Sequence, residues 1–132
     1  MSKNVATIQA IYAAFARGDL ETLKSHLADD VTFDDRESYG IPLIAPRRGP
    51  DEAVAAFTTF RDNVDIVSSR IVKFLEGGDT VIAWADSTFV WRATGRRFSD
   101  AYNMNVFEFN ADGKVALDTH GLLLATDPSI GK

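Results

Sequence analysis

The spacing of hydrophobic residues divides the chain into a helical first half and a strand-rich second half. Apolar residues recur at helical intervals over about residues 3–17, which predicts a first helix that Gly18 ends. Asp19 can cap a shorter second helix, and Pro50 suits the first turn of a third. The predicted buried faces are Val5, Ile8, Ile11, Tyr12 and Phe15, then Leu20, Leu23 and Leu27, then Val54, Phe57 and Phe60.

The chain from residue 64 onward is rich in β-branched and aromatic residues. Four such segments cover about 64–75, 80–92, 98–109 and 114–125. The residues that join them contain Gly77-Gly78-Asp79, Thr94-Gly95 and Asp112-Gly113, which are typical of tight hairpin turns. The pattern predicts one α+β domain over residues 1–132, with helices first and a curved antiparallel sheet afterwards. A sheet wrapped around a helix can leave a conical cavity for a ligand.

Asp35 ends the run Val31-Thr32-Phe33-Asp34-Asp35, which reads as a strand entered by a turn at residues 29–30. Side chains alternate between the faces of a strand, so Val31, Phe33 and Asp35 point the same way. A carboxylate in an apolar pocket has a raised pKa and is a plausible proton carrier near neutral pH. The alternative is a strand-end acid that pairs with a nearby arginine and faces water.

Asp118 and His120 are neighbours on one face of the last predicted strand, with Ala116, while Val115, Leu117 and Thr119 take the other face. A histidine beside a carboxylate can act as an acid/base couple. The same two residues can instead lie on an outer face, in solvent or across a dimer.

Composition excludes several classes of function. The formal net charge is −5 and basic residues cluster only as pairs, which argues against nucleic acid or an anionic membrane as the main partner. Cysteine is absent, so disulfides, thiolate metal sites and a cysteine nucleophile are excluded. The two histidines lie too far apart in sequence for a recognisable metal motif. We read no signal peptide and no membrane span, so the expectation is a soluble cytoplasmic protein.

Several landmarks together resemble the nuclear transport factor 2-like superfamily, which includes ketosteroid isomerase and the SnoaL-like polyketide cyclases. These landmarks cover nearly the whole chain and are Gly18-Asp19-Leu20, Leu27-Ala28-Asp29-Asp30-Val31, Gly49-Pro50, Thr94-Gly95-Arg96, Phe107-Glu108-Phe109 and Asp112-Gly113-Lys114-Val115. The resemblance implies a cone-shaped α+β barrel. It also implies a homodimer through the outer sheet face, usually with no metal or cofactor.

Comparison with ketosteroid isomerase implies roles for single residues. Its general-base aspartate falls on Asp35, and its protonated oxyanion-hole aspartate falls on Asn105. Its oxyanion-hole tyrosine falls on Ile11, about a hundred degrees around the helix from Tyr12. An asparagine donates a weaker hydrogen bond to an enolate than a carboxylic acid does, which weakens a steroid isomerase assignment and leaves related proton-transfer chemistry.

Five further residues are candidate substrate contacts: Tyr12, Asn105, Asp86, Trp84 and Phe107. Asn105 and Phe107 share a face of one strand, and a polar amide among inward aromatic residues must be hydrogen-bonded. Asp86 interrupts a strand that is apolar on both faces, so it is paired, at an interface or a support for His120. Trp84 and Trp91 are separated by an odd number of residues and therefore face opposite sides. Each of these residues also has a purely structural interpretation.

Two functions from different classes remain open from the sequence. The first is an enzyme in which Asp35 removes a proton next to the carbonyl of a small hydrophobic polyketide-, terpenoid- or steroid-like compound. Asn105 and Tyr12 would bind the enolate oxygen, and Asp118 and His120 would return the proton. Isomerisation, cyclisation and dehydration all begin with that step, so an isomerase or a lyase would fit. The second function is a ligand-binding or dimerisation module without chemistry.

Overall fold

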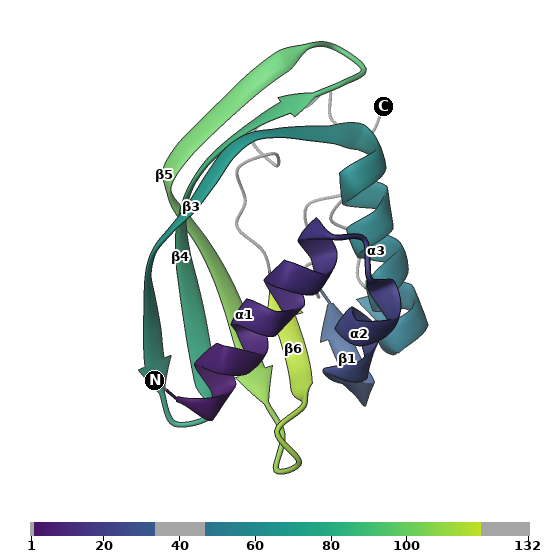
Figure 1. The fold of residues 1–132 in the computed structure, drawn as a ribbon, viewed down its shortest axis with the longest axis vertical. Coiled ribbons are helices and arrows are strands. Elements are labelled where there is room, and N and C mark those ends of the chain that lie inside the picture. Colours follow the sequence, from purple (N-terminus) through teal and green to yellow (C-terminus); the bar gives the residue numbers. More distant parts are fainter. Residues whose placement is uncertain (1, 34–46, 120–132) are drawn as a thin grey trace.

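The computed structural model describes residues 2–33 and 47–119, which form helices packed beside one strongly curved sheet (Figure 1). In chain order the elements are α1 (Lys3–Ala16), α2 (Leu20–Ser25), β1 (Leu27–Phe33), β2 (Arg47–Arg48), α3 (Pro50–Asn63), β3 (Val64–Gly77), β4 (Thr80–Trp91), β5 (Arg96–Phe109) and β6 (Val115–Thr119). The predicted α+β class, with helices before the main strands, is confirmed.

The helices begin where the sequence predicts, because suitable residues satisfy their free backbone N–H groups. The Ser2 side chain accepts a hydrogen bond from the backbone N–H of Val5 at 3.0 Å and caps α1. Asp19 accepts one from the backbone N–H of Thr22 at 3.1 Å and caps α2. Pro50 occupies the first turn of α3, where a missing N–H has no consequence.

The strands of the described residues form one open sheet in the order β2-β1-β6-β5-β4-β3. The predicted antiparallel meander from β3 to β6 is confirmed. The first strand joins it differently, because β1 pairs parallel with β6 and antiparallel with β2. The sheet curves around α1, so its concave inner face is turned toward the helices (Figure 1).

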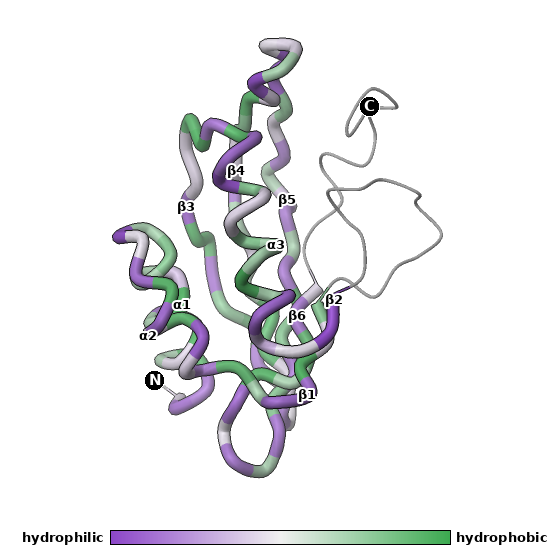
Figure 2. The backbone as a smooth tube through the Cα atoms, turned by 90° about the vertical axis from the view of Figure 1, so that its right-hand side faces the viewer, coloured by the Kyte–Doolittle hydropathy of each residue, from purple (hydrophilic) through white to green (hydrophobic). Residues whose placement is uncertain are grey.

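Strict alternation along β4 defines the two faces of the sheet. Its buried, inward residues are Val81, Ala83, Ala85, Ser87, Phe89 and Trp91, and the residues between them are partly exposed on the outer face. Buried and more exposed positions alternate in the same way along much of β5, which Figure 2 shows to be a mixture of hydrophobic and hydrophilic residues. A bulge at Ala101 and Tyr102, which together oppose Asp86, interrupts β5.

Two separate hydrophobic clusters fill the inner side. The larger one combines the buried faces of α1, α2, α3 and β1 with Val81, Ala83, Phe107, Phe109 and Val115. The smaller one contains Val64, Phe89, Trp91 and Phe98, against which Phe60 packs. The inner face between these clusters carries polar and small side chains, which makes it the place to search for a site.

Three details of the sequence prediction need correction or qualification. The second helix ends at Ser25, so Leu27 belongs to β1 rather than to that helix, and the strand begins before the expected turn. Val115 and Asp118 are both buried, although strict alternation places them on opposite faces. The pairing between β5 and β6 shifts at Glu108/Phe109, and this irregularity moves Val115 inward. Asp35 and His120 lie outside the described residues.

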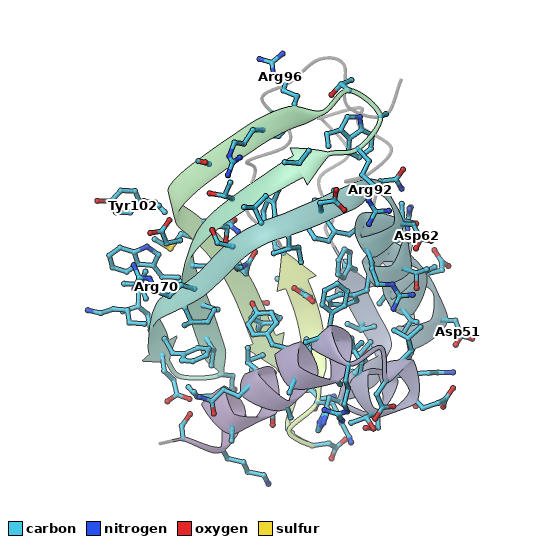
Figure 3. The ribbon with its side chains drawn as sticks, turned by 45° about the horizontal axis from the view of Figure 1, so that its top comes forward. Asp51, Asp62, Arg70, Arg92, Arg96 and Tyr102 are labelled. Atoms are coloured by element: carbon cyan, nitrogen blue, oxygen red, sulfur yellow. The ribbon has the colours of Figure 1, made fainter. Side chains whose placement is uncertain are left out.

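Arg92 links the carboxyl end of α3 to the sheet through hydrogen bonds. Its guanidinium donates to the Asp65 carboxylate at 2.6 Å and to the backbone carbonyl oxygens of Asp62 at 2.8 Å and Arg61 at 3.1 Å. Figure 3 shows Arg92 beside Asp62 at this corner of the molecule. A cation at the carboxyl end of a helix satisfies free carbonyl groups and opposes the negative end of the helix dipole.

We therefore expect Arg92→Met, which keeps the apolar stem, to lower the free energy of unfolding by about 1 kcal/mol. The matched control is Arg70→Met, because Arg70 forms one exposed ion pair with Asp86 at 3.4 Å. That control should change the free energy of unfolding by less than about 0.5 kcal/mol. Urea unfolding followed by circular dichroism measures both. Equal effects of the two substitutions would contradict the role assigned to Arg92.

Candidate functional site

Buried polar side chains gather on the inner face of the sheet. Among the described residues, the buried polar side chains are those of Ser87, Asn103, Asn105 and Asp118. Polar groups are rarely placed in such surroundings without hydrogen-bonding partners or a function. Their common location makes this part of the inner face the candidate site.

Asp118 is the acidic residue of this group. It is the penultimate residue of β6, lies opposite Phe107 of β5, and has only 1% of its surface exposed. Both carboxylate oxygens are shielded from solvent. The alternation of β6 alone predicts two possible faces for this residue, and the structure selects the inner one.

Tyr12 reaches the same region from α1. Its ring meets the Phe107 ring edge-on, with centroids 6.1 Å apart and planes at 77°. Ile11, the position where the resemblance would put a tyrosine, is instead buried in the larger hydrophobic cluster. The helix thus directs Ile11 into packing and the neighbouring Tyr12 toward the polar residues.

The Tyr12 hydroxyl is buried, and no group of the described residues meets both the distance and the angle of a hydrogen bond to it. Burial raises the pKa of this phenol well above its ordinary value, and the nearby Asp118 carboxylate raises it further. A hydrogen-bonding interaction with the Asn105 side chain lowers the pKa and offsets part of this rise. Tyr12 is therefore a neutral hydrogen-bond donor at all pH values at which enzymes ordinarily work.

Asn105 completes the group from β5, where it pairs with Ala83 of β4. The small alanine leaves the inner face near Asn105 free of a large neighbouring side chain from β4. Tyr12, Asn105 and Asp118, from a helix and two strands, are brought together in this way, and we call them the Tyr12 cluster. It combines a neutral phenol, an amide and a carboxyl group, which is a suitable set for binding an oxygen atom and moving a proton.

Two of the predicted substrate contacts lie elsewhere. Trp84 and Asp86 occupy outward positions of β4, on the opposite face from the Tyr12 cluster. The indole N–H of Trp84 donates to the backbone oxygen of Ala101 at 2.7 Å, and its ring stacks on Tyr102 with centroids 5.4 Å apart. Asp86 pairs with Arg70 at 3.4 Å. Strict alternation along β4 keeps both residues away from the inner face.

Ser87 and Asn103 are the inner-face polar residues that the sequence prediction did not single out as site residues. The Asn103 amide donates to the Ser87 hydroxyl at 3.3 Å, and the Ser87 and Ser69 hydroxyls are 3.1 Å apart. The signal was present in the sequence, because Ser87 and Asn103 hold alternating positions with inward apolar residues. Recognising it required the register between β4 and β5, which the sequence alone does not give.

No group of three or more histidine or acidic residues in residues 2–33 and 47–119 is arranged to hold a metal ion. No helix within the described parts of the chain has the length and apolar character needed to cross a membrane.

Comparison with known proteins supports the fold described above and identifies the family of the chain. No curated protein matches the chain significantly. A crystallised nuclear transport factor 2-like protein from Burkholderia xenovorans is 23% identical, with a TM-score of 0.79 and 93% of each chain covered. A protein from Xanthomonas campestris described as a putative polyketide cyclase is 19% identical, with a TM-score of 0.65, 89% of this chain and 87% of that chain covered.

A third similar structure is a Mycobacterium tuberculosis protein crystallised in complex with estradiol-17beta-hemisuccinate. It is 15% identical, with a TM-score of 0.69, and the alignment covers 91% of this chain and 93% of that one. These three structures support the fold of the described residues. The SnoaL-like domain family matches residues 8–117, which is most of the sequence. The chain therefore belongs to the SnoaL-like family, and it shares its fold with the nuclear transport factor 2-like protein from B. xenovorans.

Proposed function

We propose that this protein catalyses proton transfer on a small, mainly hydrophobic carbonyl compound, without a cofactor. The observation that carries the proposal is the buried Tyr12 hydroxyl, which lies beside Asn105 and Asp118. No group of the described residues meets both the distance and the angle of a hydrogen bond to this hydroxyl. A buried donor without such a partner costs about 1–3 kcal/mol, and a ligand oxygen would remove that cost.

The proposed reaction begins with removal of a proton from the carbon next to the carbonyl. The C–H electron pair becomes the enolate, and the negative charge develops on the carbonyl oxygen. Tyr12 and Asn105 donate hydrogen bonds to this oxygen, which stabilises it more strongly than the neutral carbonyl. Asp35 accepts the proton, and Asp118 with His120 delivers a proton to the product carbon or oxygen. The roles of Asp35 and His120 come from the sequence alone.

The environment of Tyr12 suits the role of donor. Its raised pKa keeps the phenol protonated, so it donates a hydrogen bond instead of carrying a charge that would repel an enolate. The surrounding Phe107 and the larger hydrophobic cluster exclude water, which strengthens electrostatic interactions at this position. The ligand's remaining surface should therefore be apolar. The steroid derivative bound by the similar M. tuberculosis protein is a ligand of this kind.

A second candidate function is binding of the same class of compound without a reaction. The amide of Asn105 favours it, because an amide stabilises an enolate less than a carboxylic acid at that position would. Both functions require the Tyr12 cluster to bind the oxygen of the unreacted carbonyl compound. They differ in whether a carbon-bound proton exchanges with solvent.

Deuterium uptake distinguishes them directly. With 2-decalone, a saturated two-ring ketone, in D2O, the wild-type protein should accelerate exchange of the protons next to the carbonyl, followed by NMR. Asp118→Asn should slow this exchange by about 100-fold, the usual scale of one general acid or base. Tyr12→Phe should slow it by a comparable factor through loss of an enolate donor.

Asp86→Asn is the matched control, because Asp86 is a carboxylate on the outer face of the neighbouring strand. It should leave the exchange rate unchanged. Exchange as fast in Asp118→Asn and Tyr12→Phe as in the wild type would remove the Tyr12 cluster from the mechanism. Binding of the ketone without any acceleration by the wild type would favour the second candidate function.

We also propose that the protein forms a homodimer through the outer face of β3, β4 and β5. Leu75 is 42% exposed and Tyr102 is 67% exposed, and Tyr102 stacks on the outward Trp84. Figure 3 shows Tyr102 projecting from the outer side of the sheet. An exposed group of large apolar side chains favours a protein interface, and the family resemblance implies the same face.

Replacing Leu75 and Tyr102 together by glutamate should convert the dimer to a monomer, because two carboxylates per subunit would have to be buried. Sedimentation equilibrium measures the change. Ala55→Glu, on the exposed side of α3, adds a carboxylate away from this face and should leave the dimer intact. A wild-type protein that is monomeric at high concentration would contradict the proposal.

A further inference from the structure

A belt of small and polar residues crosses the inner face between the two hydrophobic clusters. On β4 it contains Ala85 and Ser87, and on β5 it contains Asn103 and Asn105. Large aromatic side chains lie on both sides of it, with Phe107 and Tyr12 at one end and Phe89 and Phe98 at the other. The Tyr12 cluster takes up only the Asn105 end of this belt.

The other end of the belt is a hydrogen-bonded chain of three side chains. Asn103 donates to Ser87 at 3.3 Å, and Ser87 shares one hydrogen with Ser69 at 3.1 Å. Ser87 is only 1% exposed and Asn103 only 7%, whereas Ser69 is exposed on the edge strand β3. We call Asn103, Ser87 and Ser69 the Asn103 chain.

The Asn103 chain has hydrogen-bonding capacity left over. A primary amide has two donors and an acceptor oxygen, and a hydroxyl has one donor and two acceptor positions. The bonds to Ser87 and Ser69 use one N–H of Asn103 and one hydroxyl hydrogen. The second N–H and the amide oxygen of Asn103 remain available on the inner face. A ligand hydroxyl or carbonyl oxygen is the natural partner for such a group.

Stability alone does not account for the Asn103 chain. Replacing both partners of a buried hydrogen bond by apolar side chains of similar shape is often neutral or stabilising. Leucine in place of Asn103 and alanine in place of Ser87 would also join the two hydrophobic clusters into one. A polar chain placed between two apolar clusters is better explained by a polar ligand group.

We propose that the Asn103 chain is a second polar subsite, which binds an oxygen function at the far end of the ligand. This inference rests on the proposed function, because the first oxygen is the carbonyl bound by the Tyr12 cluster. Successive inward residues of a strand are about 7 Å apart, so Asn103 and Asn105 fix the separation of the two oxygens. The ligand class is therefore a rigid apolar compound with two oxygen functions, such as a hydroxyketone or a diketone across two fused rings.

A matched pair of probes tests this subsite. 2-Naphthol is a planar mimic of an enol with one oxygen, and 2,7-dihydroxynaphthalene adds a second oxygen at the far side of the same ring system. Isothermal titration calorimetry with the wild-type protein should give about tenfold tighter binding of the diol, equivalent to about 1.4 kcal/mol. In Asn103→Leu and Ser87→Ala this preference should disappear, while the affinity for 2-naphthol stays within about twofold of the wild-type value.

The chain offers a closely matched control. Thr88 and Ser99 form a hydroxyl pair at 3.0 Å on the outer face of the same two strands. The double substitution Thr88→Ala and Ser99→Ala should keep the preference for the diol. Tyr12→Phe should weaken both probes by a similar factor and also keep the preference. Circular dichroism and the unfolding midpoint of each variant establish that it is folded.

The outcomes separate the two proposals. If both probes bind the wild type with equal affinity, or the preference survives in Asn103→Leu and Ser87→Ala, the second subsite is overturned and the proposed function stands. If neither probe binds the wild type, the proposed function fails, and the second subsite fails with it.

Discussion

Removal of polar groups from water is the constraint on which this account depends. The inner face of the sheet buries a phenol, two amides, a hydroxyl and a carboxyl group among aromatic and aliphatic side chains. Each of these groups loses hydration, a cost that hydrogen bonds or a functional role must offset. The raised pKa of Tyr12 is the most direct sign of it. A ligand oxygen that accepts from Tyr12 would restore what burial removed.

The backbone of the sheet decides which side chains take part. Alternation along β4 sends Ser87 inward and Trp84 and Asp86 outward, and the bulge at Ala101 and Tyr102 resets the alternation of β5. The irregular pairing of β5 and β6 then leaves Asp118 opposite Phe107, near Tyr12. Small shifts of register therefore decide which side chains line the inner face, because one residue of slip would exchange the inner and outer sets.

Sequence reasoning predicted the helices, the antiparallel meander and the family, because these follow from local periodicity and turn residues. It grouped Tyr12, Asn105 and Asp118 as candidates through the resemblance and alternation, and the structure brings these three together. It placed Trp84 and Asp86 among the substrate contacts, because the run from Val81 to Trp91 is apolar on both faces and periodicity cannot say which face is inner. The Asn103 chain depends on cross-strand register, a non-local property. Asp35 and His120 lie outside the described residues and stay predictions.

The central claim is that the Tyr12 hydroxyl is buried as a neutral donor beside Asp118. Carbon-13 NMR of the Cζ atoms of the tyrosines, followed as the pH is raised, measures the pKa of each phenol, and Tyr12→Phe assigns the signal of interest. We expect the Tyr12 signal to stay in its protonated position through the pH range in which an ordinary phenol, with a pKa of about 10, ionises. Ionisation of Tyr12 near the ordinary phenol value would show that the inner face is open to water, and it would contradict this claim.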